Sequence, residues 1–196
     1  MPASLIKFCR TVHWISSAIA LIGVLFFALT GLTLNHPEWF AGKRSSQYQE
    51  LQLDEAWLSR FSISSEAEAF QQLTQFVNQQ WSLPVPTNID RDEFEWVMDY
   101  QRPGGVSTVV LDLEVGLLTY EKESDGVIAL INDLHKGRHS GLVWSLFIDV
   151  SAILALVFAL SGLVLLWAYC KKRPSTWPLV LAGLAVPLVI YGVFVP

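Results

Sequence analysis

The sequence predicts a membrane α-helical fold, with three transmembrane helices and an extracytoplasmic α+β domain inserted between helices 1 and 2. Hydrophobic residues make up 52% of the 196 residues and the mean hydropathy is +0.40, which is too apolar for an ordinary soluble domain. Three apolar runs are each long enough to cross a bilayer. Charge is also segregated, because residues 37–140 carry 17 acidic and 8 basic side chains, a net charge of −9.

The first predicted segment, residues 1–36, is a basic cytoplasmic stub followed by a transmembrane helix. From Trp14 to Leu34 the chain has 21 residues without a charge, about 31 Å as a helix. A signal peptide is the rival interpretation, but its apolar core would be shorter and a cleavage site with small residues should follow. The segment that follows, Asn35 to Phe40, does not resemble such a site, so we expect an uncleaved helix.

Residues 37–140 form the predicted extracytoplasmic domain. Ser64 to Trp81 has the periodicity of an amphipathic helix with Ser65 as its N-cap. Three strands are predicted at Glu93–Tyr100, Val106–Leu113 and Leu117–Glu121. One helix packed on a small antiparallel sheet would give this domain a core of its own. Its acidic charge argues against a nucleic-acid partner.

The second predicted membrane helix occupies residues 141–170, and residues 171–196 form a cytoplasmic turn and a third helix. Basic residues gather before the first helix and between the second and the third: Lys7, Arg10, Lys171, Lys172 and Arg173. The positive-inside rule therefore predicts a cytoplasmic N-terminus and an acidic domain on the opposite side of the membrane.

The two main helices share a short motif. Residues 27–32 read Phe-Ala-Leu-Thr-Gly-Leu, and residues 158–163 read Phe-Ala-Leu-Ser-Gly-Leu. Small residues let a neighbouring helix, or a flat cofactor, approach closely. Helix packing alone is the simpler explanation of the motif.

All four histidines lie at predicted membrane boundaries. His135 and His139 are four residues apart and would share one face of a helix. Together with His36 they fall at the outer boundary, where imidazoles from neighbouring helices could hold a b-type haem and Arg138 could pair with a propionate. Zn²⁺ or Cu²⁺ bound by His36, His135 and His139 is an alternative. The plainest alternative is that these residues only anchor the helix end at the interface.

His13 lies at the inner boundary, about 34 Å from His36 along a straight helix, so the two cannot share one iron. It is a candidate ligand for a second haem, although an interfacial residue beside Trp14 is the more ordinary interpretation. Asp149 is the one acid within a membrane run. We expect it to face protein, as a hydrogen-bond partner of a histidine, as part of a proton path or as a link between helices.

Several short motifs resemble the PepSY-associated transmembrane family. They are His13-Trp14, Thr30-Gly31, Val109–Asp112 with Gly116, Leu134–Gly137 and Ser161–Leu163. Together they cover most of residues 10–168. The resemblance implies a PepSY-like α+β domain. Larger family members include proteins similar to ferric-siderophore or flavin-linked reductases, with b-type haems held by membrane histidines, and the family's first-helix histidine matches His13.

These features predict a haem b-binding electron-transfer protein of the bacterial inner membrane, with its soluble domain in the periplasm. No dinucleotide-binding fingerprint is present, so an electron-donor or acceptor protein must complete any oxidoreductase reaction. Whether the chain is an enzyme in its own right or an electron-transfer subunit stays open. The alternative function is a non-enzymatic membrane scaffold or regulatory subunit that binds a partner through its PepSY domain. Contact with the lipid bilayer and assembly into a homo- or hetero-oligomer are expected in either case.

Overall fold

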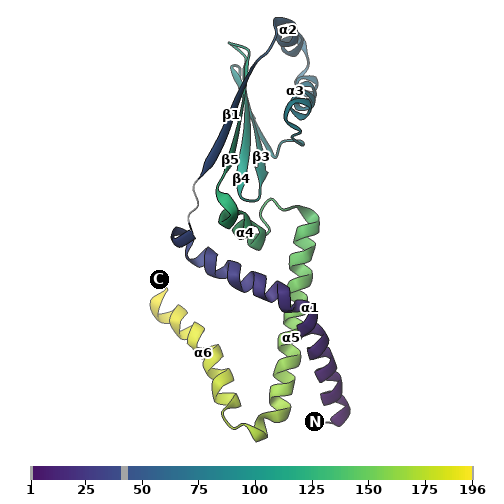
Figure 1. Ribbon diagram of the computed structural model, residues 1–196, viewed down its shortest axis with the longest axis vertical. Coiled ribbons are helices and arrows are strands. Elements are labelled where there is room, and N and C mark those ends of the chain that lie inside the picture. The colour runs from purple at the N-terminus through teal and green to yellow at the C-terminus, as the bar shows by residue number, and fades with distance from the viewer. Residues whose placement is uncertain (1, 41–43, 196) are drawn as a thin grey trace. The chain divides into compact units, whose positions relative to one another are not determined.

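The computed structural model describes residues 2–40 and 44–195 of the chain (Figure 1). It divides into two compact units. The first, here called the helical unit, consists of Met1–Phe26 and Phe147–Pro196. The second, here called the sheet unit, is Phe27–Leu146.

Among the described residues, three helices are long and apolar enough to cross a membrane. They are α1 (Ala3–Asn35), α5 (Gly141–Tyr169), which continues into a short 3-10 turn at Cys170–Lys172, and α6 (Thr176–Phe194). The second predicted helix coincides with α5, whereas α1 begins well before the predicted start at Trp14. Apolar side chains surround all three helices, as expected for segments in contact with lipid.

In the helical unit, α1 packs on α5 through small side chains. Cys9, Ser16 and Ala20 are buried on α1, at 8, 3 and 5% exposure. A Cβ added at Gly23 would lie 3.5 Å from the Ser151 hydroxyl oxygen, so the two backbones approach closely at this point. α6 contributes no buried residue to the described part of this unit.

The sheet unit contains a five-stranded antiparallel sheet in the order β1-β5-β4-β3-β2 (Figure 1). Its strands are β1 (Ser45–Gln52), β2 (Asn88–Arg91), β3 (Glu95–Arg102), β4 (Gly105–Asp112) and β5 (Leu117–Ser124). The three predicted strands correspond to β3, β4 and β5. The sequence prediction lacks β1 and β2 because both are polar edge strands whose residues are almost all exposed, so they show no apolar alternation.

Two helices, α2 (Glu55–Ile63) and α3 (Glu66–Trp81), cover one face of the sheet (Figure 1). The predicted amphipathic helix is α3. The backbone N–H and hydroxyl of Ser65 donate to the carboxylate of Glu68 at its N-terminus, and these bonds lower the pKa of Glu68 below its usual value. The fully buried side chains between helix and sheet are Leu73, Val77, Met98, Val109, Leu111 and Leu118.

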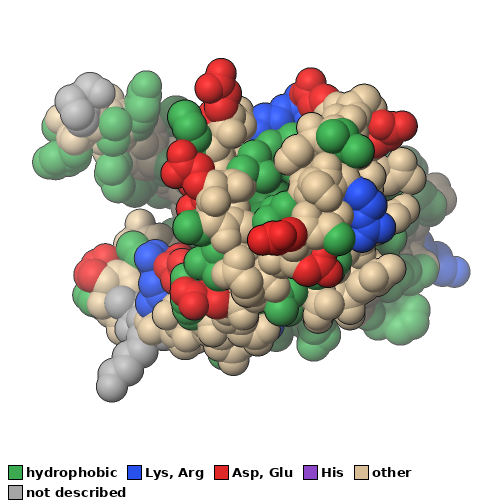
Figure 2. Space-filling model, turned by 90° about the horizontal axis from the view of Figure 1, so that it is seen from above, with side chains coloured by type: hydrophobic (Ala, Val, Ile, Leu, Met, Phe, Trp, Pro, Cys, Tyr) green, Lys and Arg blue, Asp and Glu red, His purple; other side chains and the backbone are tan. Residues whose placement is uncertain are grey.

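Two shorter helical segments complete the sheet unit, η1 (Pro37–Phe40) after α1 and α4 (Gly126–Lys136) after β5. The acidic charge of the unit is spread over its surface. Figure 2 shows Asp and Glu side chains scattered around the end of the unit that carries α2, rather than gathered in one cluster. On this face the acidic side chains are therefore dispersed and exposed to solvent.

Candidate functional site

Two of the four histidines pack against the Phe-Ala-Leu-Ser/Thr-Gly-Leu motif that occurs in both main membrane helices. His13 contacts the copy at residues 158–163, and both lie in the helical unit. His135 contacts the copy at residues 27–32, and both lie in the sheet unit. Each copy of the motif therefore holds one histidine.

The His13 imidazole is bound through its Nδ1 atom. Nδ1 lies 3.0 Å from the Ser161 hydroxyl oxygen and 3.1 Å from the Phe158 carbonyl oxygen. Ser161 itself donates its proton to the same carbonyl, at 2.9 Å. Because both neighbours of Nδ1 are then acceptors, Nδ1 carries the proton and donates it. The neutral imidazole consequently keeps its free lone pair on Nε2.

Aromatic stacking and a glycine complete the contact around His13. Its ring lies 4.6 Å from the Phe158 ring, with an angle of 18° between the two planes. A Cβ added at Gly162 would lie 3.0 Å from Cε1 of the imidazole. The glycine of the motif thus makes room for the ring, and a larger residue there would push it away.

His135 lies at the end of α4 and repeats this arrangement. Its Nδ1 lies 2.5 Å from the Thr30 hydroxyl oxygen, and Thr30 is 2% exposed. Thr30 donates to the Phe27 carbonyl oxygen at 3.3 Å, and the Phe27 ring meets the imidazole edge-on at 5.2 Å. A Cβ at Gly31 would come 3.8 Å from Cε1 of His135. A hydroxyl can donate or accept, so either tautomer of His135 fits this contact, and the Nδ1-protonated tautomer is the one that leaves a lone pair on Nε2.

Hydrogen bonds from two neighbouring residues of α4 hold this helix, and they fix the position of His135. The Asp133 carboxylate accepts a hydrogen bond from the Gly104 N–H, 2.9 Å away, in the turn between β3 and β4. On its other side, the Asn132 side-chain oxygen accepts from the Thr33 hydroxyl of α1, at 2.6 Å. The helix that presents His135 is therefore tied both to the sheet and to the membrane helix within this unit.

The expectation that His135 and His139 share one helical face is wrong. α4 ends at Lys136, because Gly137 adopts a left-handed conformation with φ 68° and caps the helix. His139 follows in the turn, exposed and with a φ of 53°. Arg138, the predicted propionate partner, is exposed and lies 4.0 Å from the Asp133 carboxylate.

His36 makes only local contacts. Its ring stacks on Trp39 at 3.8 Å, its Nε2 lies 3.3 Å from the Asn35 side-chain nitrogen, and its Nδ1 lies 3.9 Å from the Glu38 carboxylate. Within the described residues, no three His, Cys, Asp or Glu side chains form a group that could hold a metal ion. The structure therefore does not gather His36 and its two predicted partners into a Zn²⁺ or Cu²⁺ site.

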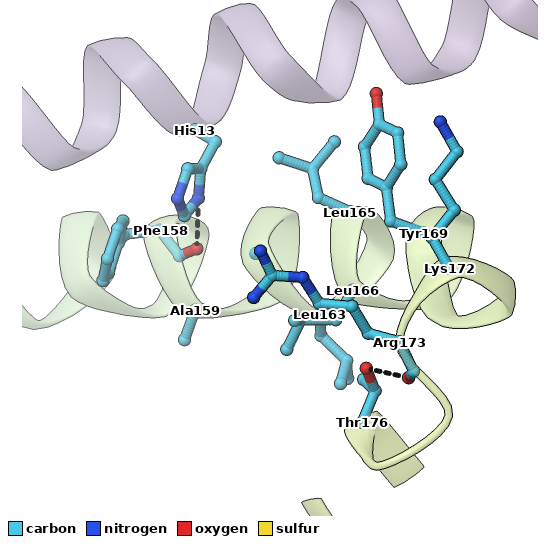
Figure 3. A pocket seen from close by; sticks show the side chains of 11 residues that line it. His13, Phe158, Ala159, Leu163, Leu165, Leu166, Tyr169, Lys172, Arg173 and Thr176 are labelled. Carbon is cyan, nitrogen blue, oxygen red and sulfur yellow. Dashed lines mark hydrogen bonds between the residues drawn. The ribbon is translucent and has the colours of Figure 1, made fainter.

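A pocket of about 720 Å³, here called the His13 pocket, opens beside His13 in the helical unit (Figure 3). Figure 3 shows His13 pointing from α1 toward α5 at one end of this pocket. The apolar lining residues are Phe158, Ala159, Gly162, Leu163, Leu165 and Leu166. The polar lining residues besides His13 are Tyr169, Lys172, Arg173 and Thr176. The Tyr169 hydroxyl oxygen accepts a hydrogen bond from Arg10, at 2.6 Å.

Sequence reasoning selected His13 but missed the basic end of its pocket. In the sequence, Lys172 and Arg173 mark only the predicted cytoplasmic side of the membrane. A helical count would have shown more, since Gly162, Leu166 and Tyr169 recur at spacings of four and three along one face of α5 that leads to this turn.

Asp149 is exposed in the single chain, whereas the sequence predicts that it faces protein. It belongs to α5, and no hydrogen-bond or ion-pair partner lies near it in the part of the chain that the structure describes. The predicted roles of Asp149 beside a histidine or as a link between helices are therefore not realised in this chain alone.

The comparisons with known proteins identify a family. A family model described as "Putative PepSY_TM-like" matches residues 4–196, which is nearly the whole chain. Neither the search of curated proteins nor the search of solved structures found a match.

Proposed function

The chain belongs to the PepSY_TM-like family, and from this premise we propose that it is a haem b-binding membrane protein that transfers electrons together with a partner protein. One observation carries the proposal. His13 and His135 are each held through Nδ1 by a Ser or Thr hydroxyl of an equivalent motif. With Nδ1 protonated, each presents a free Nε2, the atom that an imidazole uses to ligate an iron when Nδ1 is occupied.

The surroundings of His13 suit a haem. An axial imidazole usually donates its other ring N–H to a carbonyl or a similar acceptor, and Phe158 and Ser161 supply such acceptors. The pocket volume of about 720 Å³ lies within the range of about 300–1,000 Å³ that is common for cofactor sites. Its walls of leucine and phenylalanine suit a flat apolar ring. A bound haem would supply one-electron transfer, while the chain orients the ligand and excludes water.

His135 is the proposed ligand at the second motif. The predicted ligands His36 and His139 have weaker support, because the former stacks on Trp39 and the latter lies in an exposed turn. A haem needs only one or two protein ligands, so the absence of a three-residue metal group among the described residues does not bear on it. The proposal therefore assigns one histidine to each of two sites.

The proposed orientation follows from charge. Lys7 and Arg10 precede the first span and Lys171 to Arg173 follow the second, so the positive-inside rule favours a cytoplasmic N-terminus. The acidic sheet domain would then lie in the periplasm of a bacterium, as the family resemblance implies. Labelling of single cysteines placed in the domain and in the turn after α5 tests this orientation in intact cells.

The direct test is an absorption spectrum of the full-length protein after haem-replete expression. We expect a Soret band, with a reduced spectrum and pyridine haemochrome of the b type. His13→Ala and His135→Ala should each lower the haem-to-protein ratio. His139→Ala is the matched control, since this exposed side chain has no contact with either motif in the described structure, and it should leave the ratio unchanged.

The haem proposal would be overturned if the protein had no Soret band, or if neither alanine substitution changed its haem spectrum. The scaffold alternative would then be the better account. It predicts that His13→Ala and His135→Ala leave the capture of a partner by the sheet domain intact.

A further inference from the structure

We propose that Lys172 and Arg173 bind the acidic end of the ligand in the His13 pocket. On the proposed function, on which this inference rests, that ligand is haem and the acidic groups are its two propionates. No feature of the sequence assigned these residues to a ligand, because they were read only as part of the cytoplasmic positive charge. The structure places both of them in the lining of the pocket.

The first argument is an uncompensated charge. The lining of the His13 pocket contains two permanent cations, Lys172 and Arg173, and no aspartate or glutamate. The ion pairs found in the described structure all lie between residues 36 and 138, so neither cation has an acidic partner there. Both side chains are exposed and so accessible to a ligand, and a ligand that brings negative charge would complement them.

The second argument is direction. Figure 3 shows the Arg173 side chain turned back over α5 toward the His13 end of the pocket, while Lys172 points toward α1 beside Tyr169. In the described structure the hydrogen bonds of Arg173 involve its backbone, whose N–H donates to the Cys170 carbonyl oxygen and whose carbonyl oxygen accepts from Thr176, so the guanidinium group remains available. A guanidinium group binds a carboxylate through two parallel hydrogen bonds, which gives orientation as well as affinity.

The third argument is the polarity of the pocket along its length. An imidazole lies at one end, leucine side chains form the walls, and the two cations lie at the other end. A ligand that matches this order is an amphiphile with an apolar body and acidic groups at one edge. Haem has this form, and its two propionates match the two cations in number and in sign.

A plainer explanation is that the two side chains only reach toward lipid headgroups, as basic residues at helix ends commonly do. An acidic phospholipid would satisfy the same cations. These explanations differ from the proposal in one respect. They predict that the charge of the haem propionates is irrelevant to binding at His13.

The test compares haem with its dimethyl ester, in which both acids are blocked. Full-length apo-protein in detergent is titrated with each compound at the Soret band. A His135→Ala background isolates the His13 site, with His135→Gln in its place if the alanine variant does not fold. Because the ester cannot form charged hydrogen bonds with the two cations, we expect the free acid to bind about tenfold more tightly than the ester. In Lys172→Gln/Arg173→Gln this preference should disappear.

Lys171→Gln is the matched control. Lys171 carries the same charge, precedes Lys172 directly and does not line the pocket, so its variant should keep the wild-type preference. Equal binding of acid and ester by the wild-type protein would overturn the proposal, and so would an equal loss in the Lys171→Gln variant. The loss of co-purified phosphatidylglycerol from the double variant, with its haem preference unchanged, would assign the cations to a lipid and also overturn it. A protein that binds neither compound would instead contradict the proposed function itself.

Discussion

Removal of the hydroxyl group that holds each histidine should affect the two histidines unequally. In Thr30→Val, Nδ1 of His135 loses the hydroxyl oxygen 2.5 Å away, and no second hydrogen-bond acceptor for this nitrogen is found among the described residues. In Ser161→Ala, Nδ1 of His13 loses one acceptor but keeps the Phe158 carbonyl oxygen at 3.1 Å. With Nδ1 protonated, as the proposed function requires, the first substitution leaves this donor unpaired, whereas the second only removes one of two acceptors.

The magnitudes follow from this difference. An unpaired donor in a largely desolvated place costs about 1–3 kcal/mol, whereas the loss of one ordinary hydrogen bond costs about 0.5–1.5 kcal/mol. Partners of metal-ligating histidines change metal affinity by about 10- to 100-fold. On the proposed function we therefore expect Thr30→Val to weaken haem binding at His135 close to 100-fold, and Ser161→Ala to weaken binding at His13 about tenfold or less.

Haem titration of the full-length apo-protein measures both effects, with His13→Ala and His135→Ala backgrounds to isolate each site. Thr30→Ser keeps the hydroxyl group and is the matched control, so it should bind haem like the wild-type protein. If the two substitutions weakened binding equally, or if Ser161→Ala had the larger effect, the reasoning from the hydrogen-bond partners would be refuted.

Three further predictions concern the sheet unit and the membrane span. Gly104 has a φ of 73°, and a Cβ there would lie 2.8 Å from the Leu130 backbone. Gly104→Ala should therefore displace α4 and lower the haem content at His135. Gly116→Ala, which is remote from α4, is the control and should destabilise the sheet without changing the haem spectrum. Asp149→Leu removes an exposed carboxylate from a span and should stabilise the isolated chain in bilayers by about 2–3 kcal/mol; thermal unfolding in nanodiscs checks this, and a lower melting temperature would contradict it. Burial raises the pKa of Tyr100 from 10.0 to about 12, so above pH 10 the unfolded state loses this proton first and stability should fall between pH 10 and about 12. Denaturant unfolding across that range should show a shallower fall in Tyr100→Phe.

The elements that the sequence predicts well are those with a strong local signal. α3 shows a capping residue and a regular apolar stripe, and α5 is an uninterrupted apolar run between Gly141 and Tyr169. The polar edge strands β1 and β2 lack such a signal, since their place depends on pairing with β5 and β3. α4 is missing from the prediction because residues 133–139 are interpreted as the start of the next membrane helix, whereas the left-handed conformation of Gly137 ends α4 before α5 begins at Gly141.

The residues of the candidate site could be predicted from the sequence, but not which histidine contacts which copy of the motif. The four histidines and the repeated motif are visible in the sequence, yet nothing local indicates which histidine meets which copy. His13 and Ser161 are 148 positions apart, and Thr30 and His135 are 105 apart. Contacts over such separations are set by the packing of helices, which a single sequence does not reveal. The predicted grouping of His36 with His135 rests on equal depth in the membrane alone, which does not indicate the contact between His135 and Thr30.

The hydrogen bonds and the small glycine of the repeated motif explain why a histidine packs against it. In a helix, a Ser or Thr three residues after Phe donates its proton to the Phe carbonyl, as Ser161 and Thr30 do, and its lone pairs then face outward as acceptors. The glycine that follows leaves space for an imidazole, and the Phe ring supports it from the side. In the copy at residues 158–163 the Phe158 carbonyl also accepts from Nδ1, which selects the Nδ1-protonated tautomer of His13 and leaves its Nε2 free. On the proposed function, the two copies, each holding its own histidine, would supply two single-histidine sites.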